Sequence, residues 1–469
     1  MTPPFETDAP VAGIAAGHVF PHAGLEGQPA TEGWRRVLGV PSLVLLGLVY
    51  MVPLTIFSTY GIVVELTGGR LSAAYAVTLV VMLFTARSYG RMAQAFPFGG
   101  SAYIYTARSF GPALGFMAGW SLLLDYLLLP MINYLLIGIY LNAAFPIVPP
   151  WLFMLVSIVA VTALNILGIT AIAKANFVVV GLQALFIVLF VGMGLSSIAG
   201  TGHVDLMAPF TGTGGAEGIS PVLAGSAILC LSYLGFDAVS TFAEETRNPT
   251  RNVPRAIMLT TVLAGVIFLG LAYISHLVHP VSTFANVDSA ANDVIGAAGG
   301  NLLVAFFTAA YIAGSLGSAL TSQASVSRII HSMGRGRVFP AALGRLHPRF
   351  GTPVLPIILT SCVSLLALVL DLLTVSSLIS FGALVAFSAV NVCVIKHYFF
   401  DRKARGLKGM VQNLVLPAVG FVLTVWLWTS LSGLSITVGL CWAGLGLVYL
   451  AFLTRGFRRP APQLELDHA

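Results

Sequence analysis

Long apolar runs recur along the whole chain, and they constrain its fold more than any other feature. Charged residues make up only 9% of the 469 residues, whereas a soluble domain carries about 25%. A run of about 20 apolar residues forms a helix long enough to cross a bilayer. The sequence therefore predicts an all-α integral membrane protein. Twelve transmembrane helices are expected, at residues 37–64, 72–94, 113–141, 151–170, 174–198, 220–243, 255–278, 301–328, 354–371, 374–398, 412–432 and 435–454.

The basic residues predict the orientation of these spans. If both termini lie on one side, all of the 23 Lys and Arg except Arg70 fall on that side. The positive-inside rule makes that side the cytoplasm, so we expect a multi-pass protein of the plasma (inner) membrane with both termini cytoplasmic. Basic loops then act as topology signals, and the net charge of +6 gives no reason to expect a nucleic-acid partner. Residues 1–36 and 455–469 are predicted to be cytoplasmic tails, the first of them disordered.

Two of the predicted spans contain residues that interrupt a helix. Pro53 removes a backbone hydrogen bond from the first span, and Thr55 is one of several small polar residues beside it. In the sixth span, Gly235 stands between Tyr233 and Asp237. Interrupted helices in corresponding places of two halves point to an inverted-repeat transporter with its site at the breaks. The alternative is that Pro and Gly are simply common in membrane helices.

Asp125 lies in the middle of the apolar run GWSLLLDYLLLPMINYLLIGIYL. An ionised carboxylate at that depth costs at least about 2.5 kcal/mol, so it needs a partner. Ser121 and Asn133 share its face of the helix, and no basic residue lies at comparable depth in any predicted span. A proton or a cationic substrate is therefore the expected partner; the alternative is a structural hydrogen bond to a neighbouring helix.

Three further acidic or polar positions are candidates for function. Asp237 either binds a cation, takes up a proton, or accepts hydrogen bonds from the amides that the sixth-span break frees. Glu244 and Glu245 precede a basic loop and are expected to pair with Arg247 or another arginine of that loop, as a cytoplasmic gate or a structural latch. Gln323 either reaches the cavity or belongs to close helix packing, because small residues surround it.

The chain lacks the sequence signatures of common enzymes. It contains no phosphate-binding glycine loop, no set of metal ligands at recognisable spacing and no nucleophile elbow. We therefore expect neither an enzyme nor a cofactor or metal.

Three segments resemble the amino acid–polyamine–organocation permeases: RMAQAFPFGGSAYIYTARSFG, SYLGFDAVSTFAEETRNPTRNVPRAI and SRIIHSMGRGRVFP. With the spans and breaks, the resemblance covers residues 35–455. It implies the five-plus-five inverted-repeat fold of the sodium-coupled leucine transporters, with helices 1 and 6 interrupted and alternating access. The first repeat would then comprise residues 37–200 and the second 220–400, with helices 11 and 12 within 412–454.

The resemblance also bears on the substrate. Many amino acid carriers of this family bind the substrate carboxylate with the amides of a Gly-Ser-Gly-like turn in the first span. The matching positions here are Pro53, Leu54 and Thr55, where proline has no amide and leucine adds bulk. The segments YMVPLTIFSTYG and WSLLLDYLLLPMINY look similar instead to the proton-coupled putrescine importers. In that fold the position of Asp125 should line the cavity, which favours a cationic amine without a carboxyl group.

The resulting expectation is a secondary active importer of a polyamine, putrescine first among them, by proton symport through Asp125 or Asp237. Some family members place a lysine in the fifth span, at the position where sodium carriers bind their ion. This chain has Gln183 in the comparable stretch, so a lysine in place of sodium is not expected. The residue that would bind the second ammonium of a diamine is left open. The candidates are Asp237, Glu65 and the aromatic faces of Tyr126 and Tyr233. The predicted substrate-binding set is Asp125, Thr55, Pro53, Tyr233, Asp237, Ser121 and Gln323.

Two rival functions stay open from the sequence. One is an amino acid importer or exchanger of the same superfamily. The other is a transporter-like sensor that binds amines without moving them. The sequence makes no prediction of the oligomeric state.

Overall fold

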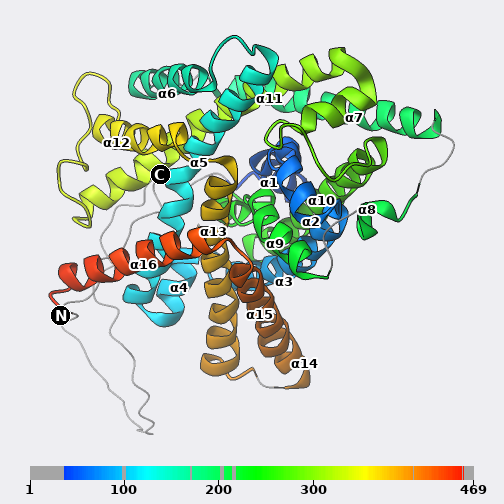
Figure 1. The fold of residues 1–469 in the computed structure, drawn as a ribbon. Helices are drawn as coiled ribbons and strands as arrows, with labels where there is room; N and C mark the ends of the chain where they lie inside the picture. Colours follow the sequence, from blue (N-terminus) through cyan, green and yellow to red (C-terminus); the bar gives the residue numbers. More distant parts are fainter. Residues whose placement is uncertain are drawn as a thin grey trace, which may run out of the picture. The chain divides into compact units, whose positions relative to one another are not determined.

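The computed structural model describes residues 36–97, 102–168, 172–200, 205–213, 218–404, 406–456 and 458, without the side chains of 172–177. From Arg36 onward the described chain folds into packed helices (Figure 1). It contains no β-strand within these residues, only a single parallel bridge between Leu38 and Thr246. The expected tails, 1–36 and 455–469, lie almost wholly outside the described residues.

The α-helices are α1 (Val40–Met51), α2 (Tyr60–Thr67), α3 (Leu71–Ala95), α4 (Ala102–Phe110), α5 (Pro112–Ala144), α6 (Pro150–Leu167), α7 (Ile172–Gly200), α8 (Ala208–Thr211), α9 (Ser220–Leu229), α10 (Pro249–Val278), α11 (Ala291–Arg335), α12 (Val354–Ser364), α13 (Leu372–Val394), α14 (Leu407–Met410), α15 (Leu416–Thr429) and α16 (Gly433–Leu453). Four short 3₁₀-helices are η1 (Pro53–Phe57), η2 (Cys230–Tyr233), η3 (Ala238–Ala243) and η4 (Leu365–Leu368). Two π-helical turns are η5 (Ile395–Asp401) and η6 (Val411–Val415).

The apolar runs form helices of membrane-spanning length. Among the described residues, eleven helical segments are long and apolar enough to cross a bilayer. The span expected at 354–371 is a shorter apolar helix, Val354–Leu368. Large apolar side chains such as Val188 and Phe452 point out of the bundle with more than half of their surface exposed, as lipid-facing residues do. The chain is a multi-pass membrane protein.

Both expected breaks are present, and they touch each other. α1 ends at Met51, Val52 takes up φ 47° and ψ 91°, and η1 follows before α2 resumes the path. In the sixth span, α9 gives way to η2 and then to Gly235, whose φ is 126°. Only glycine adopts that backbone without strain. A Cβ at Gly235 would lie 2.9 Å from the Met51 Cγ atom, so glycine is also needed for the two breaks to meet.

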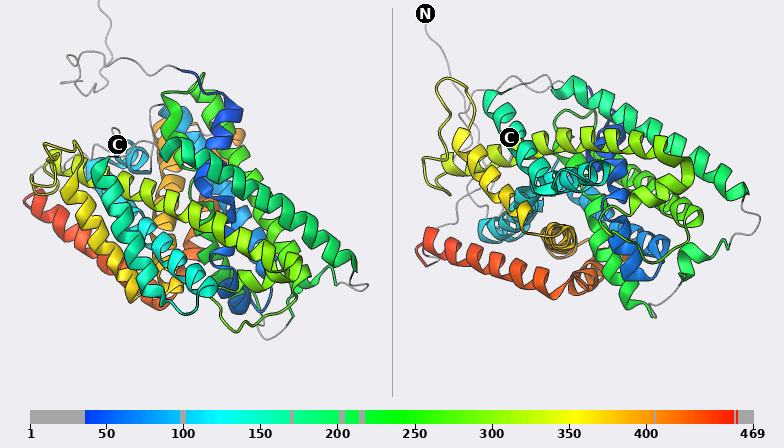
Figure 2. Two further views of the ribbon diagram at one scale, coloured as in Figure 1. Left: turned by 90° about the horizontal axis from the view of Figure 1, so that it is seen from above. Right: turned by 45° about the horizontal axis from the view of Figure 1, so that its top comes forward.

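α5 lies at the centre of the helices that surround these breaks. α11 and α13 pack against it, α10 packs along α3, and α7 packs against α11. α16 lies at the periphery of the bundle in both views of Figure 2. It is attached through two tryptophans: Trp120 Nε1 donates to the Trp442 carbonyl at 2.9 Å, and Trp442 Nε1 donates to the Trp120 carbonyl at 2.8 Å.

The segment between α10 and α11, residues 279–290, covers the end of the bundle where α2 lies. The Phe284 amide donates to Glu65 Oε1 at 2.9 Å, and the Tyr60 and Phe284 rings meet edge to face at 6.0 Å. Gly61 lies directly beneath this segment. The segment therefore closes one side of the first break.

Replacing Gly61 by valine tests this closure. Its Cβ would lie 2.1 Å from the Val287 carbonyl oxygen and 2.6 Å from the Ala290 Cβ, and overpacking of this kind costs about 1–3 kcal/mol. We expect Gly61→Val to lower the melting temperature of the purified protein. Gly192→Val is the matched control, because no atom lies within 4 Å of that position. Equal melting of the two variants and the wild type would contradict the packing.

Candidate functional site

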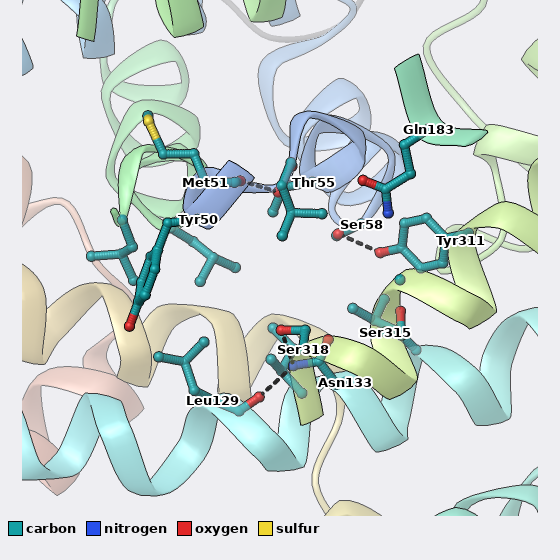
Figure 3. Close-up of a pocket in the computed structure, with 16 residues that line it drawn as sticks. Tyr50, Met51, Thr55, Ser58, Leu129, Asn133, Gln183, Tyr311, Ser315 and Ser318 are labelled. Atoms are coloured by element: carbon teal, nitrogen blue, oxygen red, sulfur yellow. Dashed lines mark hydrogen bonds between the residues drawn. The ribbon is translucent and has the colours of Figure 1, made fainter. Parts of the chain in front are cut away.

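A cavity of about 680 Å³, counting its open mouth, lies beside the break of α1, between α5, α7 and α11 (Figure 3). No charged side chain lines it among the described residues. Its polar lining consists of Tyr50, Thr55, Ser58, Asn133, Gln183, Tyr311, Ser315 and Ser318. Its apolar lining consists of Met51, Val52, Leu129, Ile132, Leu136, Leu231 and Leu234, with Gly314.

The backbone groups of the first break are already engaged. The Thr55 hydroxyl donates to the Met51 carbonyl at 2.8 Å and contacts the Val52 carbonyl as well. The Thr55 amide also donates to the Val52 carbonyl, at 2.8 Å. Pro53 has no amide. The turn therefore offers few free donors to a carboxylate.

The other walls of the cavity come from α5, α7 and α11. Asn133 Nδ2 donates to the Leu129 carbonyl at 2.8 Å and to Ser318 Oγ at 3.1 Å, as Figure 3 shows. Gln183 projects into the cavity from α7, and a Cβ at Gly314 would lie 2.1 Å from its Nε2 atom. Gly314 thus makes the room that the Gln183 amide occupies.

Aromatic rings seal the cavity on the side of α2. The Phe57 ring packs edge to face against Phe186, Phe190 and Phe307, with centroids 5.4–5.9 Å apart. The Tyr140 hydroxyl donates to the Phe57 carbonyl at 2.6 Å, and the hydroxyls of Ser58 and Tyr311 are 2.5 Å apart. These contacts pack the side of the cavity toward α2 with aromatic rings.

On the side away from α2, the cavity continues toward the N-terminal end of α1. A second cavity of about 740 Å³ shares the walls formed by Tyr50, Gln183 and Ser318. It extends past Val49 in α1 and Thr321 in α11. Val49 precedes the break along the chain, whereas Phe57 follows it. The site is therefore packed with aromatic rings at one end and continues into a second cavity at the other.

Asp125 lies one helical turn beyond Leu129 and does not line the cavity in this conformation. Its side chain is 4% exposed, and its Oδ1 atom has no hydrogen-bond partner among the described residues. Asp237 is close enough to interact with it electrostatically. Tyr50, a wall of the cavity, interacts with both carboxyl groups. The two acids therefore lie within electrostatic range of each other and of Tyr50, beside the cavity. We refer to them as the acid pair.

Asp237 is held by the break of the sixth span. The Gly235 amide donates to its Oδ1 atom at 3.1 Å, as expected for a carboxylate beside freed amides. This hydrogen bond fixes the carboxyl group near Asp125 without supplying a positive charge.

The remaining predicted residues do not line the cavity. Pro53 shapes the break, Ser121 donates to the Met117 carbonyl at 3.0 Å, and the buried Tyr233 ring packs against Phe268 at 5.4 Å. Gln323 is fully buried, with Nε2 donating to Ser361 Oγ at 2.6 Å.

Gln323 also accepts a hydrogen bond from Asn165 Nδ2 at 2.8 Å. Its amide thus joins α11 to α6 and α12, which fits the alternative of helix packing. Tyr50 and Tyr311 were missed by the sequence reasoning, because an aromatic residue in an apolar span carries no signal of its own.

The predicted gate residues lie where the chain enters α1. The Leu38 amide donates to the Glu245 carbonyl and the Arg247 amide to the Leu38 carbonyl, both at 3.0 Å. Arg247 Nε donates to the Arg36 carbonyl at 3.4 Å. The ion pair found in the described part of the chain joins Lys396 to Asp401, so no Glu245–Arg247 pair is formed in this conformation. The gate role of Glu244, Glu245 and Arg247 stays a prediction.

A third acidic position lies on the closed side, outside the spans. Burial raises the pKa of Asp288, and the carboxylate of Asp371 adds to the effect. Asp371 itself caps α13 by accepting the Thr374 amide at 2.7 Å. Within the described residues, no group of three or more His, Cys, Asp or Glu is placed to hold a metal ion.

Comparison with known proteins decides the family. The model of the amino acid permease family matches residues 42–449. The chain belongs to the amino acid permease family. This permease is 40% identical over 440 residues to the low-affinity putrescine importer PlaP of Escherichia coli, covering 92% of this chain and 96% of the relative. It is 28% identical to the branched-chain amino acid permease BcaP of Bacillus subtilis over 445 residues, covering 90% and 93%.

The methylthioribose transporter of Bacillus subtilis is 26% identical over 454 residues, covering 91% of this chain and 95% of the relative. The family and these relatives are transporters rather than enzymes.

Thiol labelling tests whether the permease is open where the cavities meet. Ser318 lines both cavities, whereas Ser226 is fully buried at the contact between α9 and α3. In a cysteine-free background, Ser318→Cys should react with a small hydrophilic thiol reagent much faster than Ser226→Cys. The rates are measured by mass spectrometry of the labelled protein. Equal rates would show that the cavity does not open to water.

Proposed function

We propose that this permease imports a small diamine, putrescine first among them, by proton symport with alternating access. The observation that carries the proposal is the 40% identity, along nearly the whole chain, to the low-affinity putrescine importer PlaP of Escherichia coli. The cavity and its neighbouring acids support it independently.

The lining of the cavity suits a chain with polar ends and an apolar middle. Leu129, Ile132 and Leu136 of α5 form an aliphatic wall, opposite hydroxyl and amide groups such as Ser58 and Gln183. A tetramethylene chain can pack on the aliphatic wall, while hydroxyl and amide oxygens accept hydrogen bonds from ammonium groups. The first break supports the same substrate class, because Pro53 lacks an amide and the Thr55 amide is engaged.

The acid pair supplies the charge that a diamine needs. An ammonium about 4 Å from a carboxylate gains about 4 kcal/mol at an effective dielectric constant near 20, before desolvation. Asp125 and Asp237 interact electrostatically, so the pair can hold one proton and the ammonium groups of the substrate in the same state. Proton symport follows if that proton and the substrate bind from one side of the membrane and are released together on the other.

Among the candidates for the second ammonium, the geometry favours Asp237. It interacts with Asp125 and with the cavity residue Tyr50. Glu65 is engaged by the Phe284 amide on the closed side, and Tyr233 packs against Phe268 away from the cavity. Tyr126 interacts with both acids and can add a cation–π contact.

Placing both termini in the cytoplasm makes this conformation inward-facing. The cavity continues toward the beginning of α1, and the aromatic seal around Phe57 lies on the other side. Ten spans in two inverted repeats, at 37–200 and 220–400, with two further spans within 412–454, would let the breaks rock between this state and an outward-facing one. The segment between α10 and α11, which contains Phe284 and lies over Gly61, would then be the outer lid.

A branched-chain amino acid is the rival substrate, because the Bacillus subtilis relative BcaP shares 28% identity over 90% of this chain. A carboxylate in this cavity would need donors at the first break, where Thr55 already bonds to Met51 and Val52.

Uptake into proteoliposomes tests the proposal. Radiolabelled putrescine should accumulate when the outside is acidic, without sodium, and a protonophore should abolish the accumulation. Asp125→Asn should lower uptake at least about tenfold, since losing about 1.4 kcal/mol is enough for that factor. Asp205→Asn is the matched control, because Asp205 caps an exposed turn at the Met207 amide.

Each alternative outcome has a distinct meaning. Normal putrescine uptake by Asp125→Asn would contradict the role of the acid. Uptake of leucine or valine but not of putrescine would replace the substrate. Uptake that needs sodium and ignores the protonophore would refute proton coupling.

A further inference from the structure

A cluster of basic side chains lies at one end of the bundle, where α3 ends and the chain passes from α13 to α15. Arg87 and Arg91 are one turn apart on α3 and repel each other. His397 of η5 interacts electrostatically with Arg91 and Arg402. In this cluster the acid Asp401 is bonded to Lys396. The cluster therefore carries a surplus of positive charge held in a small space.

The cluster is built on a rigid platform. The Arg91 guanidinium stands 4.0 Å from the centre of the Tyr398 ring, and the Arg402 guanidinium stands 5.6 Å from the same centre. Arg91 Nη2 also donates to Asn413 Oδ1 at 2.8 Å, and the Tyr398 hydroxyl donates to the Arg91 carbonyl at 3.0 Å. Two cations thus share one aromatic ring, and their positions are fixed by packing.

Two donors of the cluster are buried without an acceptor. Arg87 Nε and Arg91 Nε are shielded from solvent and find no hydrogen-bond partner among the described residues, and the ring nitrogen His397 Nε2 is also unpartnered there. A buried donor normally has a partner, because leaving it unpaired costs about 1–3 kcal/mol. By contrast, other loop arginines such as Arg335 and Arg345 are exposed, as topology signals usually are. An anion is the partner that these donors and charges fit.

The surface beside the cluster is apolar. The turn between α13 and α15 exposes Phe400 (53%), Leu407 (79%), Met410 (41%) and Val411 (43%). Figure 1 shows α14, which carries Leu407 and Met410, at the end of the hairpin formed by α13 and α15. Exposed apolar side chains interleaved with Lys396, Arg402 and Lys408 are typical of a segment that lies in the headgroup region of a membrane.

We propose that this hairpin binds the phosphate headgroup of an anionic phospholipid. Arg87, Arg91 and Arg402 contact the phosphodiester, and the exposed apolar residues of α14 and η6 contact the acyl chains. The bound lipid then links α3 to the α13–α15 hairpin, the same two elements that Arg91 and Asn413 already join.

Native mass spectrometry of the purified full-length protein tests this site. Short-chain phosphatidylglycerol and phosphatidylcholine are titrated separately, and bound lipid is counted. The wild type should bind phosphatidylglycerol more tightly. Arg402→Gln and Arg87→Gln should each weaken that binding about fivefold, because each removes one cation next to the headgroup. Arg345→Gln, an exposed arginine of another loop, should leave it unchanged.

The melting temperature of each variant, measured without added lipid, separates loss of binding from loss of fold. The proposal is overturned if the two lipids bind alike, or if Arg345→Gln weakens binding as much as Arg402→Gln. It is also overturned if millimolar inorganic phosphate displaces phosphatidylglycerol, because the site would then take a free anion rather than a lipid.

Discussion

Two carboxyl groups inside the helix bundle, Asp125 buried and Asp237 half-buried, are the constraint on which the rest of the site depends. Asp125 has an oxygen without a hydrogen-bond partner in the described structure, and Asp237 accepts hydrogen bonds from backbone amides, that of Gly235 among them. Their mutual repulsion adds to the cost of burying each charge. Among the described residues no Lys or Arg forms an ion pair with either of them, so a proton or a cation has to neutralise the pair. A transporter can exploit this requirement, because the pair is stable only when something mobile is bound.

The two helix breaks put this pair next to a cavity. Gly235 allows the sixth-span break to touch Met51 at the end of α1, and the same break holds Asp237. The rings around Phe57 close the site on one side, while the other side remains open past Val49 and Thr321. Alternating access then requires only that the seal and the opening exchange sides, with the acid pair staying near the middle.

The sequence predicted the helices and the breaks because both depend on local features: apolar run length, a proline without an amide and a glycine at positive φ. It could not predict which polar residues line the cavity. Gln183 and Gln323 both interrupt apolar helices, yet the first faces the cavity and the second is bonded to Ser361. Asn133 lines the cavity, whereas Asp125, on the same stripe, lies one turn below its wall. These differences depend on how neighbouring helices are rotated and staggered, which periodicity alone does not give.

The most direct test of the acid pair compares a dication with a monocation that has the same four-carbon chain. Calorimetric titration of the purified protein with putrescine and with 1-butylamine isolates the second ammonium. If both acids neutralise the substrate, putrescine should bind at least about tenfold more tightly, since about 1.4 kcal/mol suffices for that factor. The advantage should shrink in Asp237→Asn. Equal binding of the two amines by the wild type would contradict the central role of the pair.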